Sequence, residues 1–213
     1  MIDPEAVVYI VDDDPAARAS VAALVQSKSV VTREFASAEE FLESLPSDDR
    51  GCLVLDVRMT GMTGLELQEE LGKRKIDLPI VVITGFADVP MAVKAMRAGA
   101  VNFLTKPCKT DELWQNIKQA LERQHADRSS RVQREAIEAR MATLTEDETA
   151  VLARVMDGLP NKRIARELDI GLRTVELRRS NVMKKMNAES LAELIQMAVM
   201  VGFPAASDNG DAE

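Results

Sequence analysis

Five short runs rich in valine and isoleucine constrain the fold of this chain most, because each is followed by a stretch with helical spacing of apolar residues. The runs are AVVYIV at 6–11, VVTREF at 30–35, CLVLD at 52–56, PIVVIT at 79–84 and AVNFLTK at 100–106. The amphipathic stretches lie near residues 15–27, 37–45, 63–73, 88–98 and 110–124. Such alternation predicts a doubly wound α/β fold, with a buried five-stranded parallel sheet in the flavodoxin-like order 2-1-3-4-5.

Acidic side chains stand at the carboxyl ends of two of these runs. Asp12 and Asp13 follow the first run within an aspartate triplet, and Asp56 closes the third. Strands 1 and 3 are neighbours in the expected order, so these carboxylates should converge at one edge of the sheet. Asp14 followed by Pro15 has the pattern of a helix N-cap with proline at the first helical position, and the triplet alone is explained by that. We expect Asp14 to be the cap, which leaves Asp12 and Asp13 for a metal ion.

The groups expected at this edge suit phosphoryl chemistry. Crowded carboxylates raise one another's pKa unless a cation lies among them, and hard oxygen ligands beside a phosphate favour Mg²⁺. Thr84 ends the fourth run, and Lys106 ends the fifth, just before Pro107. Asp56 can therefore attack a phosphorus atom while Mg²⁺ and Lys106 neutralise the phosphoryl oxygens and Thr84 hydrogen-bonds one of them.

The order DD…D…T…KP at strand ends resembles the receiver domain of two-component response regulators over residues 5–124. The resemblance implies that Asp12 and Asp13 are the acidic metal-binding pair, that Asp56 accepts phosphate from a histidine kinase, and that the backbone carbonyl of Arg58 completes the metal site. It also implies that Thr84 and Lys106 are the switch hydroxyl and the essential lysine, and that Phe103 is the aromatic switch. Thr60 stands where the family often has proline.

The chain after residue 124 has a different composition. No proline or glycine occurs between Pro107 and Gly158, and residues 125–143 are rich in Ala, Glu, Arg and Gln, which favours a helical linker. The apolar positions of this linker do not keep a heptad, so a stable coiled coil is disfavoured. Residues 144–203 read as short helices without strands, and residues 204–213 as a disordered tail.

The net charge of −8 hides a basic segment, because residues 161–185 hold 8 basic and 3 acidic side chains. This segment reads as a helix, a tight turn at 169–171 and a second helix. An apolar stripe at Ile164, Ala165 and Leu168 should pack against a stripe at Val175, Val182 and Met186. A helix-turn-helix of this kind can place its second helix in the major groove of double-stranded DNA.

Residues 144–203 look like the DNA-binding domain of FixJ/LuxR (NarL-type) transcription factors. By that resemblance Glu176, Leu177 and Ser180 read base edges, and the phosphates are touched by Lys162, Arg173, Thr174, Arg178, Arg179, Lys184 and Lys185. Arg178–Arg179 stands where the family commonly has His followed by Arg, so a relative's target sequence does not transfer. Glu176 can accept from cytosine N4 or pair with a neighbouring arginine. The last apolar stretch, 190–203, serves dimerisation by resemblance, or core packing alone.

The expected function is a transcription factor switched by phosphorylation, which dimerises through the face formed by residues 88–124. RNA polymerase is a further partner that the family allows. A phosphatase working through Asp56 is disfavoured because Arg58 stands where a second acid is needed, and a receiver acting on RNA or protein is disfavoured by the helix-turn-helix pattern. His125, the only histidine, is not expected to donate phosphate.

The two cysteines, Cys52 and Cys108, are interpreted as packing residues of a cytoplasmic protein. No apolar run reaches the ~18 residues of a membrane span.

Overall fold

The computed structural model describes residues 2–45, 50–85 and 88–205, which form two compact units, Met1–Arg128 and Ser129–Glu213. One helix, α5 (Thr110–Met141), contributes residues to both units. The helical character expected for residues 125–143 is thus present up to Met141, and the boundary expected at residue 124 falls inside α5. The limits 1–124, 125–143 and 144–203 stay predictions, and most of the predicted tail (204–213) lies outside the described residues.

The first unit contains a five-stranded parallel sheet in the order β2-β1-β3-β4-β5, as predicted. Its strands are β1 (Val7–Val11), β2 (Val31–Phe35), β3 (Gly51–Asp56), β4 (Ile80–Thr84) and β5 (Asn102–Thr105). Its helices are α1 (Pro15–Gln26), α2 (Ala38–Glu43), α3 (Gly64–Lys73), α4 (Val89–Arg97) and the first part of α5. Because β1 and β3 pair directly, Asp12 and Asp56 are brought to the same edge of the sheet.

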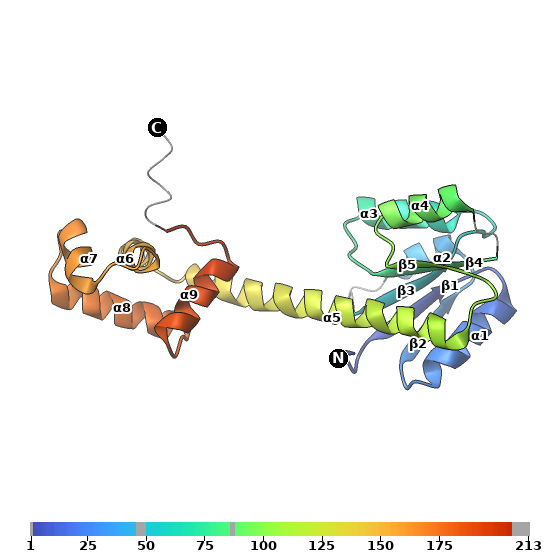
Figure 1. Cartoon of the computed structure of the whole chain (residues 1–213), viewed down its shortest axis with the longest axis horizontal. Coiled ribbons are helices and arrows are strands. Elements are labelled where there is room, and N and C mark those ends of the chain that lie inside the picture. Colours follow the sequence, from blue (N-terminus) through green and yellow to red (C-terminus); the bar gives the residue numbers. More distant parts are fainter. Residues whose placement is uncertain (1, 46–49, 86–87, 206–213) are drawn as a thin grey trace. The chain divides into compact units, whose positions relative to one another are not determined.

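Helices cover both faces of this sheet, with α1 and α5 on one side and α2, α3 and α4 on the other (Figure 1). On the α1 and α5 side, Val25 and Ile117 pack with Ile10 of β1. On the other side, Phe41 and Leu67 pack with Leu53 of β3. The central strands β3 and β4 are buried at every position, which explains why their sequences are apolar up to the last residue of each, Asp56 and Thr84.

The expectation of a sheet buried in all its strands is wrong for the two edge strands, for β5, where only Leu104 is buried, and for β2. Only Phe35 of this strand is buried, and Val31 is 56% exposed. Strand β2 lies at the edge of the sheet with a single neighbour, β1, so three consecutive polar residues, Thr32, Arg33 and Glu34, are tolerated there.

The second unit is helical over its described residues, with α6 (Glu146–Met156), α7 (Asn161–Glu167), α8 (Leu172–Met186) and α9 (Leu191–Met200) after the end of α5. Helices α7 and α8, with the connection at 168–171, form the predicted helix-turn-helix. Asp169 there has a φ of 51°, in the left-handed region that aspartate tolerates better than most residues.

The predicted packing of the two apolar stripes is half right. Val175 shares a core with Ile164 of α7, but Val182 and Met186 pack with Leu152 of α6 and Leu194 of α9 instead. The physical reason is length, because α8 has 15 residues and α7 only 7. The C-terminal half of α8 extends past α7 and needs other partners.

Candidate functional site

The centre of the candidate site is Lys106, just after β5, whose ammonium group joins two buried carboxylates. Its Nζ donates to Oδ2 of Asp12 at 2.5 Å and to Oδ1 of Asp56 at 2.9 Å. Asp12 is 2% exposed and Asp56 is 5% exposed, so both charges are largely removed from water. The charged side chains at the strand ends lie together, as predicted, and the ammonium group of Lys106 contacts both carboxylates.

The pKa values of Asp56 and Lys106 follow from burial and from the charges and hydrogen bonds around them. Burial raises the pKa of Asp56, the nearby charge of Asp12 raises it further, and the hydrogen bond from Lys106 opposes both effects. For Lys106, burial alone would lower the pKa of the ammonium, but the hydrogen bonds to Asp12 and Asp56 outweigh it and the pKa is raised. Lys106 therefore stays charged and holds the two acids together.

Asp13, expected to share a metal ion with Asp12, is bonded to the loop that follows Asp56. Its side chain is exposed, and its Oδ2 accepts from the backbone N–H of Thr60 at 2.9 Å and from Thr60 Oγ1 at 3.1 Å. Within the described residues, no group of three or more His, Cys, Asp or Glu is arranged to hold a metal ion. Asp14 caps α1 through Ala16 N–H, with Pro15 at the first helical position, as predicted.

The loop that follows Asp56 is held by carboxylates at every second amide. Arg58 N–H donates to Oδ2 of Asp56 at 2.7 Å, Thr60 N–H donates to Asp13, and Met62 N–H donates to Oε1 of Glu39 at 2.9 Å. Hydrogen bonds from the backbone N–H of Glu39 itself and then from that of Met62 lower the pKa of Glu39. Glu39 comes from α2 and was not predicted as a site residue, because a glutamate on an amphipathic helix carries no signal for such a contact.

Helix α3 begins against the backbone of Asp56. A Cβ atom placed on Gly64 would lie 2.1 Å from the carbonyl oxygen of Asp56, so only glycine allows this approach. Gly64 N–H donates to the carbonyl oxygen of Val57 at 3.0 Å. The glycine therefore helps to set the position of Asp56, a role that sequence reasoning missed.

The two predicted switch residues lie on neighbouring strands. Thr84 is fully buried at the end of β4, and its carbonyl accepts from Lys106 N–H at 2.8 Å. Phe103, on β5, is half-buried and packs against the core on the α2, α3 and α4 side of the sheet. Phe103 thus lies on the strand that precedes Lys106, and Thr84 ends the strand paired with it.

The second candidate site is the face of α8 that does not pack on the core. Exposed side chains on α8 include Arg173, Glu176, Leu177, Ser180 and Lys184, with Thr174 partly exposed, and Lys162 is exposed on α7. Leu177 is 62% exposed, so this face presents an apolar side chain among its polar ones. These residues are those expected to meet DNA.

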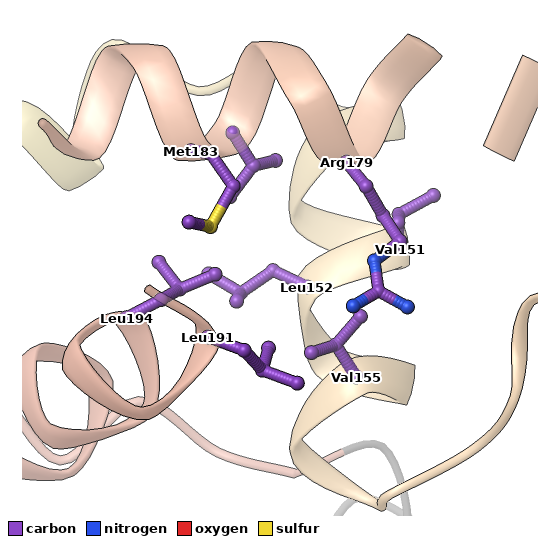
Figure 2. Close-up of a pocket in the computed structure, with 8 residues that line it drawn as sticks. Val151, Leu152, Val155, Arg179, Met183, Leu191 and Leu194 are labelled. Atoms are coloured by element: carbon purple, nitrogen blue, oxygen red, sulfur yellow. The ribbon is translucent and has the colours of Figure 1, made fainter. Parts of the chain in front are cut away.

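The other three predicted DNA-contacting residues are engaged within the unit. Arg178 pairs with Asp147 of α6, Lys185 donates to Oε2 of Glu148 at 2.6 Å, and Arg179 donates to Oδ1 of Asn161 at 2.5 Å. Figure 2 shows Arg179 among the apolar residues that line a small pocket between α6, α8 and α9. This pocket holds only about 10 Å³, no more than one water molecule needs.

Comparison with known protein families places both sites in context. Residues 8–118 match the family described as response regulator receiver domain, and residues 142–198 match bacterial regulatory proteins of the luxR family. A receiver domain followed by a luxR-type helix-turn-helix defines a DNA-binding response regulator of a two-component system, a class of transcription regulators rather than enzymes.

The chain belongs to the FixJ type within this class. It is 46% identical to the transcriptional regulatory protein FixJ of Rhizobium meliloti over 92% of this chain and 96% of that protein. It is 40% identical to the response regulator protein TmoT of Ectopseudomonas mendocina, over 92% of this chain and 90% of that one. Among solved structures, the response regulator StyR matches with a TM-score of 0.83 and 40% identity, covering 92% of this chain and 98% of StyR.

Further findings concern the membrane and the cysteines. No helix in the described part of the chain has both the length and the apolar character that crossing a membrane demands. Cys52 is fully buried among the residues packed on the α1 and α5 side of the sheet, and Cys108 packs against the same cluster, in line with the packing role expected for both. Burial strongly raises the pKa of the Cys52 thiol, so it stays protonated.

Proposed function

We propose that Asp56 accepts a phosphoryl group from a histidine kinase and that this event controls binding of the chain to DNA. The observation that carries the proposal is the Lys106 ammonium group, held 2.9 Å from Asp56 Oδ1 at the carboxyl end of the sheet. A cation fixed there can neutralise the charge that develops on phosphoryl oxygens as Asp56 attacks phosphorus. Thr84, at the end of the neighbouring strand, then supplies a hydroxyl to the phosphoryl group.

Mg²⁺ is the metal ion proposed for this site. The carboxylates of Asp12, Asp13 and Asp56 and the backbone carbonyl of Arg58 are hard oxygen donors, the kind that Mg²⁺ prefers, so the residues fit the ion in chemistry. When bound, the ion supplies positive charge that neutralises phosphoryl oxygens during transfer. The carboxylate of Asp56 already accepts from the backbone N–H of Arg58, which keeps the two residues at one end of the loop.

The output of the first unit is proposed to be dimerisation through α4, β5 and α5. A phosphoryl group adds ~1.5–2 negative charges at Asp56, which draws Thr84 inward and lets Phe103 turn toward the space it leaves. The exposed apolar surface of α4 supports this proposal: Val89 is 76% exposed, Val93 43% and Met96 46%. Apolar side chains gathered on one exposed helix favour association with a partner surface.

The DNA-binding surface is proposed to be the exposed face of α8 together with Lys162. Glu176, Leu177 and Ser180 are placed to read base edges, whereas Arg173, Thr174 and Lys184 contact phosphates. Arg178, Arg179 and Lys185 act first through Asp147, Asn161 and Glu148, holding α8 in place. On α9, Leu194 and Ala198 pack in the core, while Val199 is 64% exposed and available for dimerisation on DNA. A protein with these partners works in the cytoplasm.

The proposal is tested by measuring duplex binding before and after phosphorylation. Fluorescence anisotropy with duplexes selected from a random pool should show tighter binding after treatment with acetyl phosphate and Mg²⁺. Two half-sites bound by one dimer gain effective concentration, so the increase should be tenfold or more, an order-of-magnitude expectation. Asp14→Asn is the matched control, because it changes a carboxylate in the same triplet and keeps a good helix cap. Equal binding in both states would contradict the proposed control.

A further inference from the structure

Thr60 makes two hydrogen bonds to one carboxylate oxygen, 47 residues away along the chain. Its backbone N–H and its Oγ1 both donate to Oδ2 of Asp13, at 2.9 and 3.1 Å. Both bonds go to the same oxygen, so Oδ1 of Asp13 takes part in neither bond. Proline at this position could form neither bond, because it has no N–H and no hydroxyl.

These bonds matter because Asp13 is exposed. An exposed aspartate loses rotamer freedom when it is fixed for metal binding, and a side chain that is already held loses less. The Thr60 bonds fix Asp13 against the loop of residues 57–63, which also carries the carbonyl of Arg58. The same loop is tied to Asp56 at its start and to Glu39 at Met62.

We propose that Thr60 is a positioning residue for Mg²⁺, which holds Asp13 beside the Arg58 carbonyl before the ion arrives. The inference rests on the proposed function, since it assumes that Asp13, Asp56 and Arg58 bind the ion. Thr60 itself does not touch the metal or the phosphoryl group. Its effect reaches the ion through the carboxylate that it orients, as hydrogen-bond partners of metal ligands do in other sites.

The test is Mg²⁺ binding to the full chain by isothermal titration calorimetry, without any phosphoryl donor. Thr60→Val keeps the shape and the N–H but removes the hydroxyl, and Thr60→Pro removes both donors. We expect the dissociation constant for Mg²⁺ to rise about tenfold in the valine variant and up to ~100-fold in the proline variant. Thr60→Ser retains both donors and should restore the wild-type constant, which a role in loop packing alone would not predict.

Two further measurements make the result decisive. Thr32→Val is the matched control, because Thr32 is on edge strand β2 and its hydroxyl accepts only from the nearby Gln26 among the bonds described. The thermal midpoint without Mg²⁺ shows whether each variant folds. A dissociation constant that is unchanged or smaller in both Thr60→Val and Thr60→Pro, in folded protein, overturns the inference. Absence of saturable Mg²⁺ binding in the wild-type chain would instead refute the proposed metal site itself.

Discussion

The Nζ atom of Lys106 lies 2.9 Å from Oδ1 of Asp56, although the two residues are 50 positions apart in the chain. The same ammonium group also holds Asp12, so one cation offsets part of the charge of two buried carboxylates. Parallel pairing of β1, β3, β4 and β5 makes this possible, because it brings the ends of strands together at one edge. The charge balance at this edge governs both the stability of the first unit and its chemistry.

Lys106→Met should destabilise the chain in the absence of divalent ions. Without the ammonium group, Asp12 and Asp56 are left buried beside each other, at an expected loss of ~1–3 kcal/mol in the free energy of unfolding, discounted because Lys106 is partly exposed. Mg²⁺ should restore part of the loss by supplying another positive charge. Urea unfolding with and without Mg²⁺ measures both effects. Lys109→Met, an exposed neighbour, is the control, and equal stability of the two variants would count against this charge balance.

Gly64→Ala should be destabilising while Gly72→Ala is not, although both glycines belong to α3. A Cβ on Gly64 meets the Asp56 carbonyl, which must move, and overpacking of this kind costs ~1–3 kcal/mol. A Cβ on Gly72 meets nothing within 4 Å, so the gain in helix propensity should stabilise by up to ~1 kcal/mol. Chemical unfolding of both variants checks the contrast. Similar stabilities would show that α3 does not press on the backbone of Asp56.

Lys184→Ala and Lys185→Ala should separate DNA binding from stability. Lys184 is exposed on the proposed DNA face, so its loss should weaken binding to all duplexes and lower the slope of log affinity against log salt by ~1. Lys185 donates to Glu148 and to the carbonyl of Thr143, so its loss should chiefly lower stability. Anisotropy titrations at several salt concentrations, with unfolding curves, test both. A slope unchanged by Lys184→Ala would remove this lysine from the phosphate contacts.

The Glu148–Lys185 pair predicts how the stability of the second unit depends on pH. The hydrogen bond from Lys185, then that from Thr145 N–H, lowers the pKa of Glu148 below its usual 4.5. Because the pKa of Glu148 is lower in the folded than in the unfolded state, its charge stabilises the fold above pH ~4.5. This stabilisation is lost as the pH falls through the folded-state pKa. Glu148→Gln keeps a capping side chain but loses the charge. Its deficit against the wild type in urea unfolding, up to ~1 kcal/mol at pH 7, should vanish once the pH falls below the folded-state pKa of Glu148. A deficit that persists there would refute the charge effect.

The fold and the first candidate site were largely predictable because they follow from periodicity and topology. Apolar runs and strand order alone bring Asp12, Asp56 and Lys106 together, whatever rotamers they adopt. The bond between Thr60 and Asp13 was not predictable, since it depends on which way an exposed side chain turns. The burial of edge strand β2 was overestimated because VVTREF contains enough apolar residues to resemble an inner strand.

In the second unit, pattern predicted the helices better than their partners. Val175 packs on α7 as expected, but Val182 and Met186 do not, because spacing along a helix does not reveal how far the neighbouring helix extends. The sequence placed Arg178 and Lys185 on a basic surface, whereas both form salt bridges with acidic residues of α6. Charge in a sequence predicts a surface property, and only the fold shows which charges are already paired.

The most direct test of the account is to locate the phosphoryl group itself. Full-length protein is treated with acetyl phosphate and Mg²⁺, reduced with borohydride to trap the acyl phosphate, and mapped by peptide mass spectrometry, with Asp56→Asn and Asp14→Asn treated in parallel. The account predicts trapping at Asp56 in the wild type and in Asp14→Asn, and none in Asp56→Asn. Trapping at another residue, or equal labelling of Asp56→Asn, would contradict it.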